Sequence, residues 1–230
     1  MPNQNGTVYG LTILSPIIDD EKATPSHDLQ IRQYLAGLPT DERSPFAQWQ
    51  NSPQGTKPAT RAATHLARLV VMDDVIYVGM PACEEHLNSK YLIFESNLDG
   101  GLNGDLDGYL RGLAETAPEH LDAIWSHCVG YPGAGNVNAF VKYMKACQLT
   151  TTFFFAAVND KSVTESLRAL QTQKAVAEFI ATHQGMPVAQ LQAEFLKFAA
   201  DVKAAPTPRA GSMEHLTAAR RKIKTGGHNE

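Results

Sequence analysis

Residues 90–113 read KYLIFESNLDGGLNGDLDGYLRGL, and they contain a strand pattern, a polar turn and a helix pattern in direct succession. The first part, 90–96, is rich in aromatic and branched residues and predicts a β-strand. Alternation along this strand places Glu95 on one face of the sheet, together with Tyr91 and Ile93. After the turn, the spacing i, i+3, i+4, i+7 of one helical face follows at Leu106, Tyr109, Leu110 and Leu113.

The Asp- and Gly-rich run between the two patterns is similar to a calcium-binding EF-hand loop. A frame that starts at Asn103 puts Asp105 and Asp107 at ligand positions, but the closing bidentate Glu falls on Ala114. A helix start explains these two carboxylates better, because they can accept hydrogen bonds from free amides and complement the helix dipole. Asp99, at the end of the strand, stays a candidate for ligand binding or proton transfer.

The remaining segments complete an α+β pattern. Strands are predicted at 6–18, 64–79, 90–96 and 149–158. Helices are predicted at 24–38, on each side of Pro118 within 106–128, and at 136–148, 163–183 and 187–202. The long stretch 39–63 predicts a surface connection, and 213–224 a loose helix.

This order, β-α-β-β-α-β with extra helices, is the ferredoxin-like pattern of an antiparallel sheet with helices on one face. The other face of such a sheet needs a cover. In many proteins of this architecture a second copy provides it, in a dimeric α+β barrel, so we expect a homodimer. We expect one ferredoxin-like domain with appended helices over 1–204, and a polar, locally basic tail over 205–230.

Composition narrows the class of protein. With 43% hydrophobic and 19% charged residues the chain is typical of a globular protein, and its net charge of −4 does not favour nucleic acid as a partner. No apolar run is long enough to span a membrane, and residues 1–10 lack the pattern of a signal peptide, so a cytoplasmic location is expected. Three widely spaced cysteines predict buried free thiols rather than structural zinc.

Five stretches together resemble a bacterial family of ferredoxin-like, dimeric α+β barrel proteins that is sometimes associated with catalase- or peroxidase-type proteins. They are SPFA (44–47), THLARLVV (64–71), YLIFESNLDG (91–100), HCVGYPG (127–133) and TTFFFAAVND (151–160). A more distant resemblance is to dye-decolorising peroxidases, in which a GxxDG motif places an Asp over the haem. Here the stretch SNLDG, 96–100, matches at Asp99 and Gly100, but Ser96 replaces the first glycine.

The resemblance implies a haem-type pocket, and five side chains are its candidate residues. Asp99, His127 and Arg68 are the candidate catalytic residues, and His65, Arg68 and Tyr131 the candidate cofactor-binding residues. An imidazole can bind iron or act as a general base, and the Arg68 guanidinium can clamp a carboxylate. Each His can equally be a hydrogen-bonded structural residue. No metal site is predicted.

Three functions stay open at this point. The first is a small-molecule-binding α+β barrel, which the resemblance extends to a haem-dependent oxidoreductase of peroxidase type. The second is an enzyme of the same fold without a cofactor, and the third is a non-catalytic accessory protein.

Overall fold

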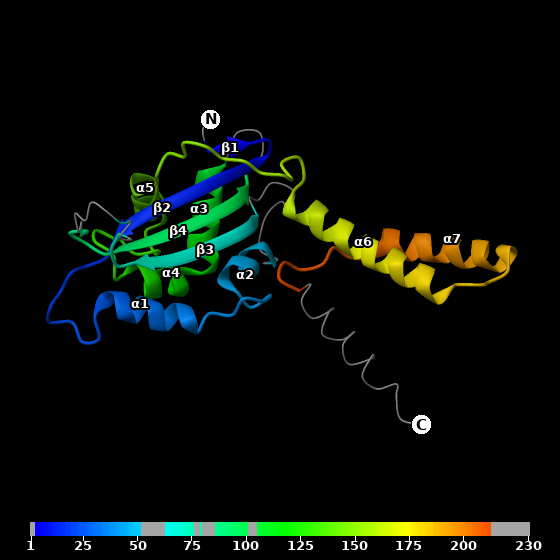
Figure 1. Ribbon diagram of the computed structural model, residues 1–230, viewed down its shortest axis with the longest axis horizontal. Coiled ribbons are helices and arrows are strands. Elements are labelled where there is room, and N and C mark those ends of the chain that lie inside the picture. Colours follow the sequence, from blue (N-terminus) through cyan, green and yellow to red (C-terminus); the bar gives the residue numbers. More distant parts are fainter. Residues whose placement is uncertain (1–2, 52–62, 76–78, 80–85, 101–104, 213–230) are drawn as a thin grey trace, which may run out of the picture. The chain divides into compact units, whose positions relative to one another are not determined.

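The structure is a computed structural model that describes residues 3–51, 63–75, 79, 86–100 and 105–212 (Figure 1). The chain separates into two compact units, the first ending at Asp160 and the second beginning at Lys161. Each unit is described by itself. The predicted domain boundary at 204 stays a prediction.

The first unit is built on a four-stranded antiparallel sheet in the order β1-β2-β4-β3. Its strands are β1 (Gln4–Asn5), β2 (Val8–Pro16), β3 (Thr64–Met72) and β4 (Tyr91–Asp99). The long strands β2 and β4 pair over their whole length, from Val8 opposite Asp99 to Pro16 opposite Tyr91. β4 is therefore an interior strand between the two other long strands, and it confirms the strand predicted at 90–96.

The described residues of this unit form five helices: α1 (His27–Ala36), α2 (Pro45–Asn51), α3 (Leu106–Thr116), α4 (Pro118–Trp125) and α5 (Val137–Ala146). The predicted helix start is confirmed, because the Asp105 side chain accepts a hydrogen bond from the Gly108 amide at 2.9 Å. Pro118 divides α3 from α4, also as predicted. Asn136 caps α5 by accepting from the Ala139 amide at 3.2 Å.

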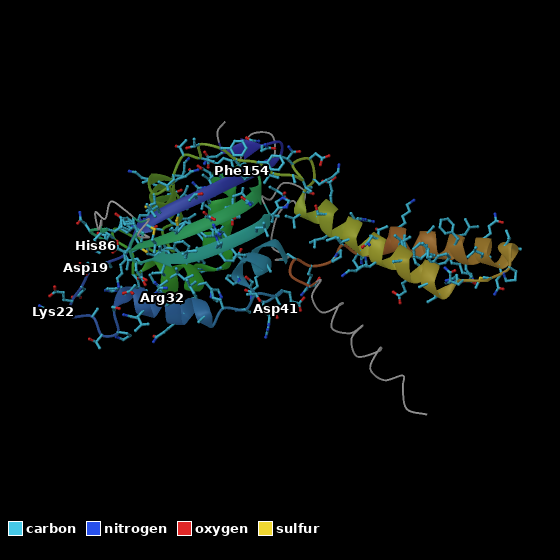
Figure 2. The ribbon with its side chains drawn as sticks, viewed as in Figure 1. Asp19, Lys22, Arg32, Asp41, His86 and Phe154 are labelled. Atoms are coloured by element: carbon cyan, nitrogen blue, oxygen red, sulfur yellow. The ribbon has the colours of Figure 1, made fainter. Side chains whose placement is uncertain are left out.

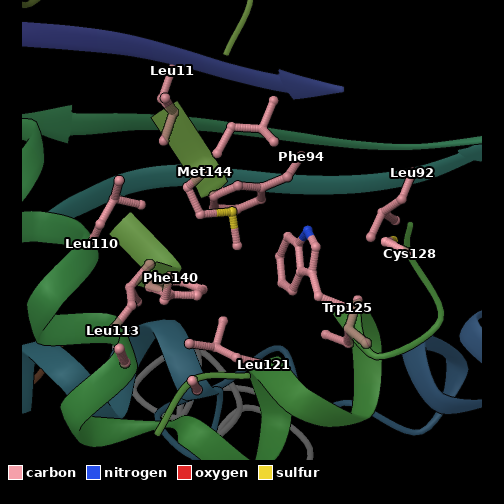
Figure 3. Close-up of a cluster of buried hydrophobic side chains, with 14 of the residues drawn as sticks. Leu11, Leu92, Phe94, Leu110, Leu113, Leu121, Trp125, Cys128, Phe140 and Met144 are labelled. Carbon is pink, nitrogen blue, oxygen red and sulfur yellow. The ribbon is translucent and has the colours of Figure 1, made fainter. Parts of the chain in front are cut away.

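The core lies between one face of the sheet and these helices (Figure 3). Every second residue of β4 is buried, beginning with Leu92 and Phe94, which are at most 1% exposed. The Trp125 ring stands edge-on to the ring of Phe94 at 5.6 Å, and Phe46 stacks on the other side of the cluster at 5.7 Å from Phe94. The stacked ring of Phe46 thus attaches the 39–51 connection to the core.

The strand predicted at 149–158 is wrong. Residues 149–158 have no strand structure, and their neighbourhood contributes only one isolated bridge, between Ile13 and Gln148. The reason lies at the N-terminus, where the chain turns back at Gly6 (φ 60°) and β1 pairs with the first residues of β2. β1 thus takes part of the edge that a fourth strand would need. The passing segment is joined to β2 by a backbone hydrogen bond, from the Leu149 amide to the Thr12 carbonyl at 2.9 Å, and to β1's flank by a side chain, since the Asn3 amide oxygen accepts from the Thr151 amide at 3.1 Å.

The fold is therefore α+β with an open antiparallel sheet. Two further predictions fall largely on residues that the structure does not describe: the continuation of the second predicted strand through 76–78, and the helix at 213–224. The connection at 39–63 contains α2, and residues 52–62 of it are outside the described ranges.

The second unit contains α6 (Val163–Thr182) and α7 (Val188–Ala204), both close to the predicted bounds. α6 begins with a capping box, in which the Ser162 hydroxyl accepts from the Glu165 amide at 3.2 Å and the Glu165 carboxylate accepts from the Ser162 amide at 2.9 Å. The two helices contact each other through aromatic rings, with Phe179 of α6 stacked on Phe198 of α7 at 4.7 Å.

Candidate functional site on the open face of the sheet

The two faces of β4 differ in burial. Residues 92, 94, 96 and 98 point into the core, while the alternate residues 91, 93, 95, 97 and 99 are only partly buried. We call the side of the sheet that carries these alternate residues the open face. In β2 the partners on this face include Gly10, Thr12 and Leu14, and in β3 they include Leu66 and Arg68.

A hollow of about 530 Å³ lies on this open face. Its lining contains both polar and apolar side chains: Thr12, Arg68, Glu95, Asn97 and Thr151 are polar, and Leu66, Phe153 and Phe154 are apolar. Phe154 lies beside β2 (Figure 2). It lies against Gly10, where an added Cβ would be only 2.9 Å from the Phe154 ring. The glycine therefore allows the 151–155 segment to form one wall of the hollow.

Arg68 and Glu95 lie directly opposite each other on β3 and β4 and form an ion pair across the floor of the hollow. The Arg68 side chain is 67% exposed and that of Glu95 is 38% exposed, so water screens this pair. Only Nη2 of Arg68 contacts Glu95, and a guanidinium has five N–H donors. Arg68 can therefore donate to an anion in the hollow while it remains paired with Glu95.

His65 and Asp99 form a second pair just beyond this hollow. Nε2 of His65 lies 2.5 Å from Oδ1 of Asp99, and the two side chains are 21% and 14% exposed. The register between β3 and β4 shifts between Thr64 and Leu66, so His65 is the extra residue of a bulge and is free to turn toward Asp99. His65 precedes Leu66 in the chain, and Asp99 is two residues beyond Asn97 on the same face of β4, so the pair borders the hollow.

His127 and Tyr131 lie elsewhere. The His127 carbonyl accepts a hydrogen bond from the Ile18 amide, just past the end of β2 that is opposite Asp99. Along a nine-residue strand these two ends are about 25 Å apart, at roughly 3.3 Å per residue. The predicted pocket that contains all five candidate residues is therefore not formed: the sheet brings His65 and Asp99 together, with Arg68 nearby, and leaves His127 and Tyr131 at the other end.

The side chains at that other end have partners of their own. Nδ1 of His127 lies 2.9 Å from Nδ1 of His27, and burial, together with this neighbouring His, lowers the pKa of His127. The Tyr131 hydroxyl donates to Asp122 at 2.8 Å, and burial raises the pKa of Tyr131, with a smaller contribution from Asp122. These contacts join α1 and α4 to the loop after α4, which is a structural role.

Burial also accounts for the cysteine in this loop. Cys128 is 2% exposed, and burial raises its pKa to about 12. A thiol with such a pKa stays protonated near neutral pH and is a poor nucleophile. Cys128 is therefore a buried free thiol, as predicted; Cys147 is a free thiol that is only partly buried, and Cys83 lies outside the described residues.

Several residues of the hollow were absent from the sequence-based set, namely Thr12, Asn97, Phe153 and Phe154. Alternation along β2 and β4 contains the signal for Thr12 and Asn97, because they share a face with Glu95. The two aromatic residues carry no such signal, since the sequence predicts a strand where the chain forms an irregular wall.

Comparison with known proteins adds no relative: no family model matches the chain, and neither a curated protein nor a solved structure is significantly similar to it. In the described part of the chain, no three His, Cys, Asp or Glu side chains are grouped in a way that could hold a metal ion. Among the described helices, none is both long and apolar enough to cross a membrane.

Proposed function

We propose that the protein binds a small amphipathic organic acid in the hollow on the open face of its sheet. The observation that carries this proposal is the lining of the hollow, where the exposed guanidinium of Arg68 lies in the same hollow as the rings of Phe153 and Phe154. A carboxylate can take the free N–H donors of Arg68, while an apolar body packs on the aromatic rim.

The other polar groups fit the same class of ligand. Thr12 and Thr151 each supply a hydroxyl that can donate to a carboxylate, and the Asn97 amide can donate as well as accept. Glu95 is the one carboxylate in the lining, and it reduces the affinity for anions by competing for Arg68. We therefore expect modest affinity for a single carboxylate and weaker affinity for a dianion.

A haem group, which the family resemblance implies, fits these residues poorly. In a peroxidase-type site the Asp lies above the ring and the iron-binding His lies below it. His65 and Asp99 are bonded directly to each other, so they cannot lie on opposite sides of one ring. His127, the other candidate His, is at the far end of β2. The proposed ligand is therefore an organic acid rather than haem.

Kinship with ferredoxin-like, dimeric α+β barrel proteins remains part of this proposal. It is supported by the antiparallel neighbours β2, β4 and β3, in which the third long strand lies between the first two. In such a barrel a second copy covers the open face. Exposed Leu66 (69%) and Phe153 (83%) are the apolar surface that a second copy would cover, and covering them would also close the hollow over its ligand.

A second candidate function, an enzyme without a cofactor, is favoured by the pair of His65 and Asp99. A carboxylate bonded to an imidazole fixes the orientation of the ring, which is the arrangement of a general base and the carboxylate that positions it. In that case a substrate in the hollow would give up a proton to His65. The accessory function has no comparable observation in its favour.

The proposal is tested by calorimetric titration of the protein with 3-phenylpropionate, a carboxylate with one aromatic ring. We expect saturable binding that Arg68→Ala weakens at least about fivefold, because removal of a charge-assisted hydrogen bond costs about 1 kcal/mol or more. Arg43→Ala is the matched control, since the Arg43 side chain is 74% exposed against 67% for Arg68, pairs with Asp41 and is not in the lining of the hollow. Equal affinity for all three proteins contradicts the proposal.

A further inference from the structure

Three successive rows of side chains cross the open face of the sheet, two residues apart along β4. In each row a residue of β3 meets a residue of β4: Arg68 with Glu95, Leu66 with Asn97, and His65 with Asp99. The first two rows line the hollow, and the third borders it just beyond the lining. From the first row to the third, β4 covers about 13 Å at roughly 3.3 Å per residue. The hollow and its border therefore form one path from the Arg68 guanidinium to the His65 imidazole.

The chemistry changes along this path. The first row offers the free N–H donors of Arg68. In the second row Leu66 is 69% exposed, and across the sheet from it Gly10 lies against the ring of Phe154. An apolar body fits between these two side chains. The path then ends at the polar His65. A ligand that fills the whole path therefore needs a carboxylate, an apolar body and a second polar group at the far end.

The atoms of the third row define which kind of polar group it can take. Nε2 of His65 lies 2.5 Å from Oδ1 of Asp99, and because an ionised carboxylate can only accept a hydrogen bond, Nε2 is the donor. A neutral imidazole has a single N–H, so a lone pair is left on Nδ1. His65 forms no other hydrogen bond within the described part of the chain. Nδ1 is therefore an acceptor for a ligand that carries a hydrogen-bond donor.

We propose that the ligand of the hollow is a carboxylic acid with a hydroxyl group at its far end, and that this hydroxyl donates to Nδ1 of His65. The proposal rests on the proposed function and narrows the class of ligand. A neutral hydroxyl fits the third row better than an ammonium group does. The side chains of His65 and Asp99 are only 21% and 14% exposed, and it is costly to take a further charge out of water at such a position.

The compound 3-(4-hydroxyphenyl)propionate has this form. Its carboxylate and hydroxyl oxygens are about 8 Å apart at standard bond lengths. A hydrogen bond of about 3 Å at each end extends the span to about 14 Å, which is comparable with the length of the path. Its ring then lies over the second row, between Leu66 and Phe154.

The test is a calorimetric titration with three acids that differ only at the para position: 3-phenylpropionate, its 4-hydroxy derivative and its 4-methoxy derivative. We expect the hydroxyl to raise the affinity about fivefold, as one added hydrogen bond does, and the methoxy group, which has no O–H, to give no gain. In His65→Phe the gain disappears, while 3-phenylpropionate still binds through Arg68. His86→Phe is the matched control and keeps the gain, since His86 also pairs with a carboxylate, that of Asp74, and neither residue lines the hollow.

The position of the proton on His65 is measured separately, in the unliganded wild-type protein, by long-range ¹H–¹⁵N NMR spectroscopy at pH 8. We expect a proton on Nε2 and none on Nδ1. A proton on Nδ1 overturns the proposal, and this readout does not depend on the folding of any variant.

Three titration results also overturn the proposal: equal affinity of the wild-type protein for 3-phenylpropionate and its 4-hydroxy derivative, a gain that the 4-methoxy derivative shares, and a gain that His65→Phe keeps. These results leave the proposed function intact, because that function depends on the binding of 3-phenylpropionate and on Arg68. Absence of binding by all three acids overturns both proposals.

Discussion

The two faces of the central strand β4 show how one stretch of sequence serves two purposes. Leu92, Phe94 and Leu98 are buried against helices, whereas Glu95 and Asn97, their neighbours in the chain, line a hollow on the open face. The buried face is apolar except for Ser96, whose hydroxyl has a partner. The open face instead mixes an ion pair, amides and hydroxyls with aromatic rings. Stability depends on the first face, and the proposed ligand binding depends on the second.

The largest effect is expected from Trp125→Ala on the buried side. Trp125 is 1% exposed and contacts Phe94 edge-on, so its removal leaves a large cavity and costs about 3–5 kcal/mol of unfolding free energy. Urea unfolding followed by circular dichroism measures this cost. Phe153→Ala, an aromatic truncation at the 83% exposed rim, is the control and is expected to cost less than about 0.5 kcal/mol. A similar loss of unfolding free energy in the two variants would contradict the claim that stability depends on the buried face.

A smaller effect is expected from Tyr109→Phe, which tests the polar exception on the buried face. The Tyr109 hydroxyl lies 2.8 Å from the Ser96 hydroxyl and 3.0 Å from that of Thr64, and all three are buried. Loss of the hydroxyl removes the hydrogen bonds that it makes with two buried side chains and costs about 1–3 kcal/mol in the same unfolding measurement. Tyr91→Phe, on the open face, is the control. No difference between the two variants would show that the buried hydrogen bonds contribute nothing.

Gly10→Ala changes the wall of the hollow and is expected to cost about 1 kcal/mol, because the new methyl group would lie 2.9 Å from the Phe154 ring. Phe154 must then move, so affinity for 3-phenylpropionate falls more than stability does. Calorimetric titration and urea unfolding of the same variant give the two quantities. A loss of stability with unchanged affinity would show that Phe154 does not contribute to ligand binding.

The smallest effect concerns pH and the far end of β2. Burial and His27 lower the pKa of His127 in the folded protein, so between this lowered value and the unfolded value of about 6.5 the unfolded chain binds more protons. Stability therefore falls as the pH is lowered through about 6.5, by less than about 1 kcal/mol after solvent screening. Thermal unfolding between pH 5.5 and 7.5 measures this change, and His127→Gln reduces it. An unchanged pH dependence in that variant contradicts the assignment.

Most of the buried face of the sheet could be predicted from the sequence, and much less of the open face could. Periodicity located β4, α3 and the division at Pro118, because burial on one side imposes a regular spacing of apolar residues. It failed at 149–158, where branched and aromatic residues predict a strand but β1 takes part of the edge. Periodicity also could not predict that His65 contacts Asp99 while His127 lies at the other end of β2. That outcome depends on a bulge in β3 and on strand register, and neither leaves a local pattern.

The central claim, that the open face is the ligand-binding face, is tested most directly by an assigned ¹⁵N–¹H NMR titration with 3-phenylpropionate. The account predicts that amide signals of Thr12, Arg68 and Asn97 move in a saturable way, while those of Leu121 and Trp125 on the covered side stay in place. Saturable shifts confined to the surroundings of His127 and Tyr131, or no saturable shifts at all, would contradict it.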